Sequence, residues 1–218
     1  MDILQVTTEG AVARITLNRP DKRNALNADL LRRLRMEFRA LAADAEVKVI
    51  VLAANGKAFC AGADLEYLQE VSRYSAMENL ADSQLLQETF HEIYSCSKPV
   101  IARVHGAAIA GGCGLASVCD YVVASESAKF GYSEVKIGFI PAVVMVYLLR
   151  KIGDTQARRL LLSAETISAQ EASRLGLATY CVPDAELGEE RSVLVARVAF
   201  HVDVAVEVLR DRDHVGDR

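Results

Sequence analysis

The sequence lacks a run of basic residues, and its formal net charge is -4. Lys and Arg are mixed with acids, so we expect no surface that neutralises nucleic-acid phosphates. Long apolar runs are also missing, since the longest uncharged one, FIPAVVMVYLL, is far shorter than a membrane span. The first residues, MDILQVTTEG, have neither a basic region nor an apolar signal region. We therefore expect a soluble, cytoplasmic protein that binds neither nucleic acid nor membrane.

Patterns that would hold a metal or a disulfide framework are missing too. The cysteines are odd in number, form no C-x-x-C pair and mostly lie inside apolar runs: Cys60, Cys96, Cys113, Cys119 and Cys181. We interpret them as reduced and structural. No His/Cys/Asp/Glu cluster has metal-ligand spacing, so no metal is predicted. Cys113 has no recognisable His or Asn partner for thiol catalysis, and no Ser/His/Asp order predicts a hydrolase.

The N-terminal part predicts a hairpin, a helix and a buried strand. Two period-2 runs in ILQVTTEGAVARITLN meet at Glu9 and Gly10, which is typical of a β-hairpin. Asn27 is a suitable N-cap for a helix whose apolar residues recur at helical spacing: Leu30, Leu34, Phe38 and Leu41. The continuous apolar run in VKVIVLAANG then indicates a strand buried on both faces.

The same pattern recurs along the chain. A helical stretch over 65–94 precedes a second buried strand in KPVIARVHGAAIAGG, which leads into the short helix CGLASVCD. YVVASESAKFG predicts a third strand and a turn, and helices follow at 142–152 and 154–162. A further helix begins at Ser168, whose spacing to Glu171 is that of a capping box. Strands alternating with helices favour an α/β fold with a mainly parallel sheet, and no linker divides the chain.

Two segments place small residues between a buried strand and a helix: VIVLAANGKAFCAGADLEYL and VIARVHGAAIAGGCGLA. Glycine at such a turn lets a ligand approach the backbone, and peptide N–H groups there can stabilise negative charge. From the glycines alone, tight packing of helix on strand is the favoured explanation. A nucleotide site is disfavoured, because neither G-x-G-x-x-G nor G-x-x-x-x-G-K-[ST] is present.

Four segments in order, NRPDKRNAL, GKAFCAGADL, KPVIARVHGAAIAGGCGLASVCD and AKFGYSEVKIGFIP, resemble the crotonase superfamily, the enoyl-CoA hydratase/isomerase family. The resemblance covers roughly residues 3–183. It implies a spiral of repeated ββα units, usually trimeric, and an acyl-CoA substrate whose thioester carbonyl lies between two peptide N–H groups. The expected partners are therefore an acyl-CoA and further copies of the chain, as a trimer or hexamer.

Carried onto this sequence, the resemblance assigns the two N–H donors to Ala63 and Gly111. It places the CoA moiety along two segments, at Lys22, Arg23, Ala25, Ala61, Asp64, Leu65 and Glu66. CoA is part of the substrate, so no separate cofactor is expected. Asp64 is expected to cap the helix LEYLQE rather than to catalyse, Asp120 to be structural and His105 to be satisfied by a hydrogen bond.

The acids depart from the pattern of the family's hydratases. Those enzymes usually carry one glutamate in the helix after the glycines and another in the PEV or SEV segment. Here the first position is Gly114 and the second is Glu134. Addition of water to an enoyl double bond is commonly shared by two carboxylates, whereas moving a double bond from the 3,4 to the 2,3 position needs one base. Glu134 alone suffices for the second reaction.

Three functions stay open at this stage. Hydration of a 2-enoyl-CoA, including branched substrates of the methylglutaconyl type, is slightly favoured over 3,2-enoyl-CoA isomerisation. A crotonase-fold binding or assembly module without turnover is the third, because the tail differs from the family's C-terminal helices. We expect a crotonase-like core over 1–185 and a divergent or truncated segment over 186–218, where alternating valines argue against a clear helix.

Overall fold

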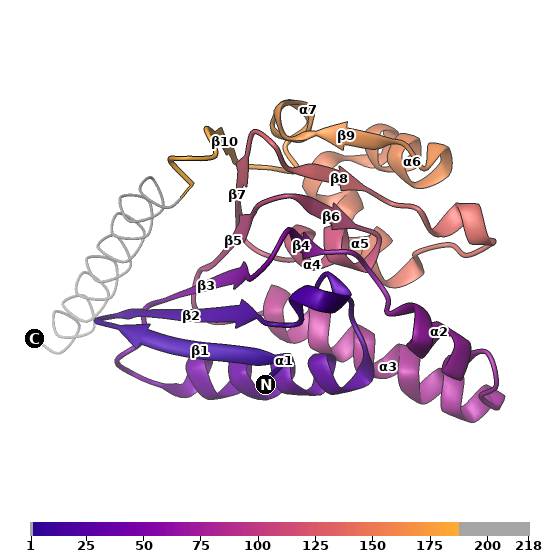
Figure 1. Ribbon diagram of the computed structural model, residues 1–218, viewed down its shortest axis with the longest axis horizontal. Helices are drawn as coiled ribbons and strands as arrows, with labels where there is room; N and C mark the ends of the chain where they lie inside the picture. Colours follow the sequence, from indigo (N-terminus) through magenta and orange to yellow (C-terminus); the bar gives the residue numbers. More distant parts are fainter. Residues whose placement is uncertain (1, 188–218) are drawn as a thin grey trace, which may run out of the picture.

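In the computed structural model, residues 2–187 are described (Figure 1). The predictions for the segment beyond residue 187 therefore lie outside the described residues. Two sheets with helices packed around them make up the fold (Figure 1). The larger sheet has the order β1 (Leu4–Glu9), β2 (Val12–Leu17), β3 (Val49–Ala54), β5 (Val100–Val104), β7 (Tyr121–Ser125) and β10 (Tyr180–Val182). The smaller has the order β4 (Ala58–Cys60), β6 (Ala107–Ile109), β8 (Lys129–Gly131) and β9 (Thr166–Ser168).

The N-terminal elements confirm the sequence prediction. β1 and β2 form an antiparallel hairpin, and β2 then pairs in parallel with β3. Helix α1 (Ala28–Ala43) is capped by Asn27, whose side chain accepts a hydrogen bond from the N–H of Leu30. Its apolar positions, including Leu34 and Phe38, are buried as their spacing predicts.

One predicted strand was wrong in its extent. The run from Val100 to Ile109 forms two strands, β5 in the large sheet and β6 in the small one. The chain turns between them at Gly106, which has φ +62° and would place a Cβ only 2.2 Å from the carbonyl oxygen of Lys57. Periodicity could not find this break, because both halves are apolar and only the contact with Lys57 requires glycine there.

The strand–strand–helix unit repeats along the chain, as the resemblance implies. The pairs β3/β4, β5/β6 and β7/β8 each place one strand in each sheet. The helical stretch after β3 and β4 is divided into α2 (Leu65–Val71) and α3 (Ala76–Tyr94). A new helix begins after Ser75, because Ser75 and Glu78 form a capping box there. The remaining helices are α4 (Gly111–Ser117), α5 (Ala142–Ile152), α6 (Asp154–Ser163) and α7 (Ala169–Leu175), with short 3-10 turns η1 (Pro20–Lys22) and η2 (Glu134–Ile137).

Within the large sheet, strand β3 is buried against apolar side chains on both faces. Ile50 and Leu52 of β3 belong to the main core together with Phe38 of α1 and Phe90 of α3. The alternate residues of β3 belong to a second, smaller cluster that includes Val49, Val51 and Ile101. β3 is therefore buried on both faces, as its continuous apolar run predicts. Among residues 2–187, no helix is long and apolar enough to cross a membrane.

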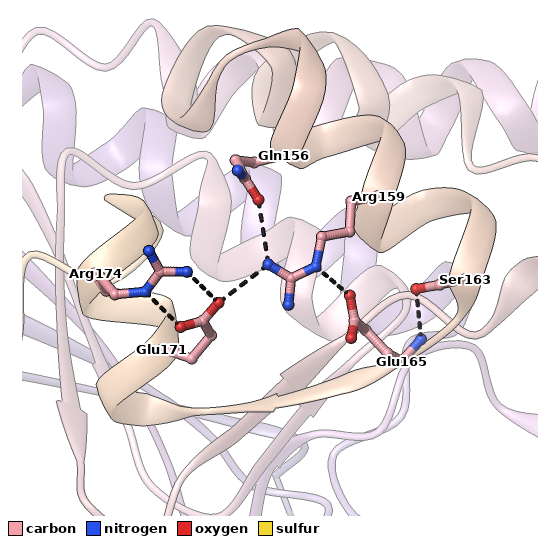
Figure 2. Close-up of polar contacts among 6 residues, drawn as sticks. All are labelled: Gln156, Arg159, Ser163, Glu165, Glu171 and Arg174. Atoms are coloured by element: carbon pink, nitrogen blue, oxygen red, sulfur yellow. Dashed lines mark hydrogen bonds and ion pairs between the residues drawn. The ribbon is translucent and has the colours of Figure 1, made fainter.

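The start of α7 has the N-cap of the predicted capping box, but not the return hydrogen bond from the glutamate. The hydroxyl of Ser168 accepts a hydrogen bond from the N–H of Glu171, so the N-cap is confirmed. The carboxylate of Glu171 contacts Arg159 of α6 at 3.1 Å and Arg174 at 2.7 Å, in a surface network (Figure 2). Arg159 also contacts Glu165, so it joins the two acids across α6, β9 and α7. The carboxylate of Glu171 is therefore engaged with Arg159 and Arg174 instead of completing the capping box.

Candidate functional site

Three neighbouring strands of the small sheet each end just before a predicted catalytic residue. β4 pairs in parallel with β6, and β6 pairs in parallel with β8. Ala63 follows the end of β4 by three residues, Gly111 follows β6 by two, and Glu134 follows β8 by three. Because the carboxyl ends of parallel strands lie at the same edge of a sheet, these segments come together there.

The peptide between Gly62 and Ala63 has a defined orientation. The carbonyl oxygen of Gly62 accepts a hydrogen bond from the N–H of Leu26 at 2.7 Å. In a planar trans peptide the N–H points opposite to the C=O, so the N–H of Ala63 points away from Leu26. No acceptor within residues 2–187 takes this N–H, and Ala63 itself is exposed.

The second N–H, that of Gly111, lies close to the first turn. The carbonyl oxygen of Ala110 accepts from the N–H of Gly114 at 3.0 Å, so the N–H of Gly111 points backward from the start of α4. A Cβ built at Gly62 would lie 3.6 Å from the nitrogen of Gly111 and 2.9 Å from the Cβ of Ala110. Gly62 has φ +95°, so both its conformation and its contact with the second turn favour glycine.

Glu134 begins η2 and is half-buried. Burial raises the pKa of its carboxyl group above the ordinary value of 4.5, and the peptide N–H groups of Glu134 and Ser133 oppose that rise. Its Oε2 atom is buried and accepts no hydrogen bond from the described part of the chain. A carboxylate in this state is a good candidate for a general base, because its proton affinity is increased and one oxygen is uncommitted.

Gly114 lies on the buried side of α4, against α5. A Cβ built there would be 2.3 Å from Cγ1 of Val144 and 3.0 Å from Cε2 of Phe90. Val144 is only 3% exposed and Phe90 is fully buried. The position where the family's hydratases usually carry the first glutamate is therefore closed by apolar side chains, which the sequence alone did not reveal.

The predicted CoA-binding residues fall into two segments that lie side by side. The N–H of Ala61 donates to the carbonyl oxygen of Arg23 at 3.0 Å, and Lys22 forms an exposed ion pair with Glu66 at 2.5 Å. Ala25 is buried, whereas the side chain of Leu65 is 76% exposed.

Asp64 is almost fully buried and already has two partners. Its Oδ1 accepts from the N–H of Glu66 at 3.0 Å, which confirms the predicted cap of α2. Its Oδ2 forms an ion pair with Arg19 at 2.7 Å. Sequence reasoning missed Arg19, whose only signal was its place in the segment NRPDKRNAL.

Three further residue predictions concern structural roles. Asp120 accepts a hydrogen bond from the N–H of Val100 at 2.7 Å, and Nε2 of His105 lies 2.9 Å from the carbonyl oxygen of Gly56, as expected. Cys113 is fully buried and its pKa is raised by burial to about 12, which agrees with a structural thiol.

The chain is similar to known proteins over most of its length. A family profile described as enoyl-CoA hydratase/isomerase matches residues 7–214. A Thermus thermophilus protein that carries the provisional name enoyl-CoA hydratase is 41% identical over 203 residues, which are 93% of this chain and 80% of the relative. Crotonyl-CoA hydratase of Syntrophomonas wolfei is 37% identical over 202 residues, 92% of this chain and 76% of the relative. An enoyl-CoA hydratase structure from Mycobacterium smegmatis superposes with a TM-score of 0.87 at 36% identity and covers 91% and 77% of the two chains.

Proposed function

Because the chain belongs to the enoyl-CoA hydratase/isomerase family, we propose that it is an enzyme acting on an unsaturated acyl-CoA. The thioester carbonyl accepts hydrogen bonds from Ala63 and Gly111, and Glu134 moves the proton at the neighbouring carbons. Hydration of a 2-enoyl-CoA is the slightly favoured reaction. The observation that carries the proposal is the convergence of three parallel strand ends, with Gly62 packed against the second turn.

The two N–H groups act on the charge that develops during the reaction. Attack at the β carbon, or loss of a proton from the α carbon, turns the thioester into an enolate whose charge resides on its oxygen. A pre-oriented donor at such an oxygen contributes about 2.7 to 4 kcal/mol to transition-state stabilisation. Both donors here are peptide N–H groups oriented by hydrogen bonds of the adjacent carbonyls of Gly62 and Ala110.

Glu134 acts as the acid–base group. Its raised pKa brings the carboxylate closer to the working pH, which makes it a stronger base than an exposed glutamate. One acid–base group contributes about 10² to 10⁴ in rate. The CoA moiety lies along the segments that contain Lys22, Arg23, Ala25, Ala61, Leu65 and Glu66, while Asp64 acts there indirectly, since both its oxygens are engaged.

Isomerisation is the alternative that a specific observation favours. Val144 and Phe90 close the space at Gly114, so no second carboxylate can hold water from that position. A single base can remove a proton from the α carbon of a 3-enoyl-CoA and return it at the γ carbon. This observation supports 3,2-enoyl-CoA isomerisation, whereas the names of the relatives support hydration.

One pair of assays distinguishes the two reactions. Purified protein is given a 2-enoyl-CoA and, separately, a 3-enoyl-CoA, and conjugation is followed by ultraviolet absorbance. Loss of conjugation with the first substrate means hydration, and gain with the second means isomerisation. Glu134→Gln is expected to lose about 10²-fold or more of either activity; retention within threefold contradicts the assigned base. CoA binding without turnover of either substrate would favour the non-catalytic module.

We also propose that the chain forms a homo-oligomer. Several large apolar side chains around η2 and the start of α5 are exposed in the single chain, at 39% or more: Val135, Ile137, Phe139, Ile140 and Val146. Such a group of exposed apolar residues is typical of an interface. Light scattering coupled to size-exclusion chromatography tests this, and a monomeric mass contradicts it.

A further inference from the structure

The turn that carries Ala63 is joined to the segment 19–26 by backbone hydrogen bonds. The N–H of Leu26 donates to Gly62 and the N–H of Asp64 donates to the carbonyl of Leu26 at 2.9 Å, which gives a short parallel bridge between Leu26 and Ala63. Asn24 is fully buried and donates to the carbonyl oxygens of Asn55 and Ala58, which holds the same two segments together at the other end.

One guanidinium connects both segments. Nη2 of Arg19 contacts Oδ2 of Asp64 at 2.7 Å, and Nη1 donates to the carbonyl oxygen of Ala25. The two side chains of the ion pair are 14% and 6% exposed. A charge-assisted pair at this burial is screened little by solvent, and the planar guanidinium fixes the direction of both of its hydrogen bonds.

Apart from these backbone hydrogen bonds, Asp64 provides the side-chain anchor of the turn. Gly62 is buried but has no side chain, and Ala63 has only an exposed methyl group, so neither residue adds a side-chain hydrogen bond that holds the turn. Asp64 is the first residue after Ala63 whose side chain is buried. Its carboxylate is held from both sides, by Arg19 through Oδ2 and by the start of α2 through Oδ1.

We propose that Arg19 and Asp64 are positioning residues that hold the N–H of Ala63 in line with the thioester oxygen. This inference rests on the proposed function of that N–H. Displacement of a reacting or stabilising group by about 1 Å can reduce the rate about 10²-fold. The ion pair therefore acts on the chemical step, because the hydrogen bond from Ala63 strengthens as charge develops on the oxygen.

The variant Asp64→Asn separates positioning from helix capping. Asparagine is as good an N-cap as aspartate, so the bond to the N–H of Glu66 and the start of α2 are retained. The charge that pairs with Arg19 is removed. We expect kcat to fall about 10- to 100-fold, while KM changes less than about threefold. Arg19→Lys is also expected to reduce kcat, since an ammonium group cannot bond Asp64 and Ala25 in the same fixed geometry as the guanidinium.

A spectroscopic measurement reports on the hydrogen bond directly. A saturated acyl-CoA labelled with carbon-13 at the thioester carbonyl binds without reacting, and its infrared carbonyl band moves to lower frequency when two donors polarise it. We expect this shift in the parent protein and in Glu134→Gln, and a clearly smaller shift in Asp64→Asn. The control Arg158→Gln removes an exposed ion pair with Asp154 on α6, far along the chain from the turn, and is expected to change neither the rate nor the band.

The outcomes separate the two proposals. A folded Asp64→Asn protein with kcat within threefold of the parent, or with an unchanged carbonyl band, overturns the positioning role. If Asp64→Asn and the control Arg158→Gln lost kcat to the same extent, the positioning role would also be overturned, because equal losses would reflect general destabilisation. If the parent protein itself gives no band shift and no turnover, the proposed function of Ala63 fails, and the positioning role fails with it.

Discussion

The side chain of Val144 occupies the space into which any side chain at Gly114 would project. The Cγ1 atom of Val144 would lie 2.3 Å from a Cβ at that position, well inside van der Waals contact. α4 and α5 can therefore pack closely at this point, because Gly114 has no side chain and the side chain of Val144 fills the space. The loss of the family's first glutamate and the apolar wall beside it are one structural feature.

This packing predicts coupled effects on stability. Gly114→Ala is expected to lower the free energy of unfolding by about 1 to 3 kcal/mol, because the added methyl group overpacks the contact. In a Val144→Ala background the same change is expected to cost clearly less, because the contact with Cγ1 is gone, although Cβ of residue 144 and Cε2 of Phe90 still lie 3.0 Å from the added methyl group. Urea unfolding of the four proteins measures the coupling, and simple additivity would contradict the contact.

The close approach of the two glycine turns predicts a catalytic effect at Gly62. A methyl group there would lie 2.9 Å from Cβ of Ala110 and 3.0 Å from the carbonyl oxygen of Ile109. We expect Gly62→Ala to push the turns apart and to reduce kcat about 10²-fold through loss of one donor. Gly10→Ala is the matched control, because Gly10 also has positive φ but no atom within 4 Å of the built Cβ. Its kcat is expected to equal that of the parent, and a similar loss in both variants would argue against the turn contact.

Glu134 predicts opposite effects of pH on activity and on stability. The base must be ionised, so kcat/KM is expected to fall as pH falls through a pKa above 4.5, the ordinary value. Because the pKa is raised in the folded state, the folded protein binds this proton more tightly, and the group's contribution to stability declines as pH rises through that pKa. Glu134→Gln is therefore expected to be more stable than the parent protein at neutral pH. Below the ordinary glutamate pKa of 4.5, the two proteins are expected to be equally stable. Thermal unfolding across pH checks the sign.

The surface network in Figure 2 predicts the reverse dependence. Hydrogen bonds from Arg174, followed by Arg159, lower the pKa of Glu171 to about 2. A lowered pKa stabilises the fold above the ordinary value of 4.5, and that contribution is lost as pH falls toward about 2. Glu171→Gln is expected to lower the unfolding temperature at neutral pH and to converge with the parent in acid. High salt is expected to reduce the difference, and an effect that persists unchanged at low pH would contradict the ionic origin.

Much of the local secondary structure of this protein can be predicted from its sequence alone. The hairpin at Gly10, the cap at Asn27 and the doubly buried strand β3 follow from period, capping and apolar runs, because each depends on neighbours in the chain. The family and the candidate groups Ala63, Gly111 and Glu134 followed from motifs. Their roles stay predictions.

Tertiary structure decided the rest, since the deciding contacts join residues far apart in sequence. The break at Gly106 depends on Lys57, the closure at Gly114 depends on Val144, and the ion pair of Asp64 depends on Arg19. Pattern and propensity describe what a residue does to its own segment, whereas steric exclusion and charge pairing across segments exist only once the sheets have brought those segments together.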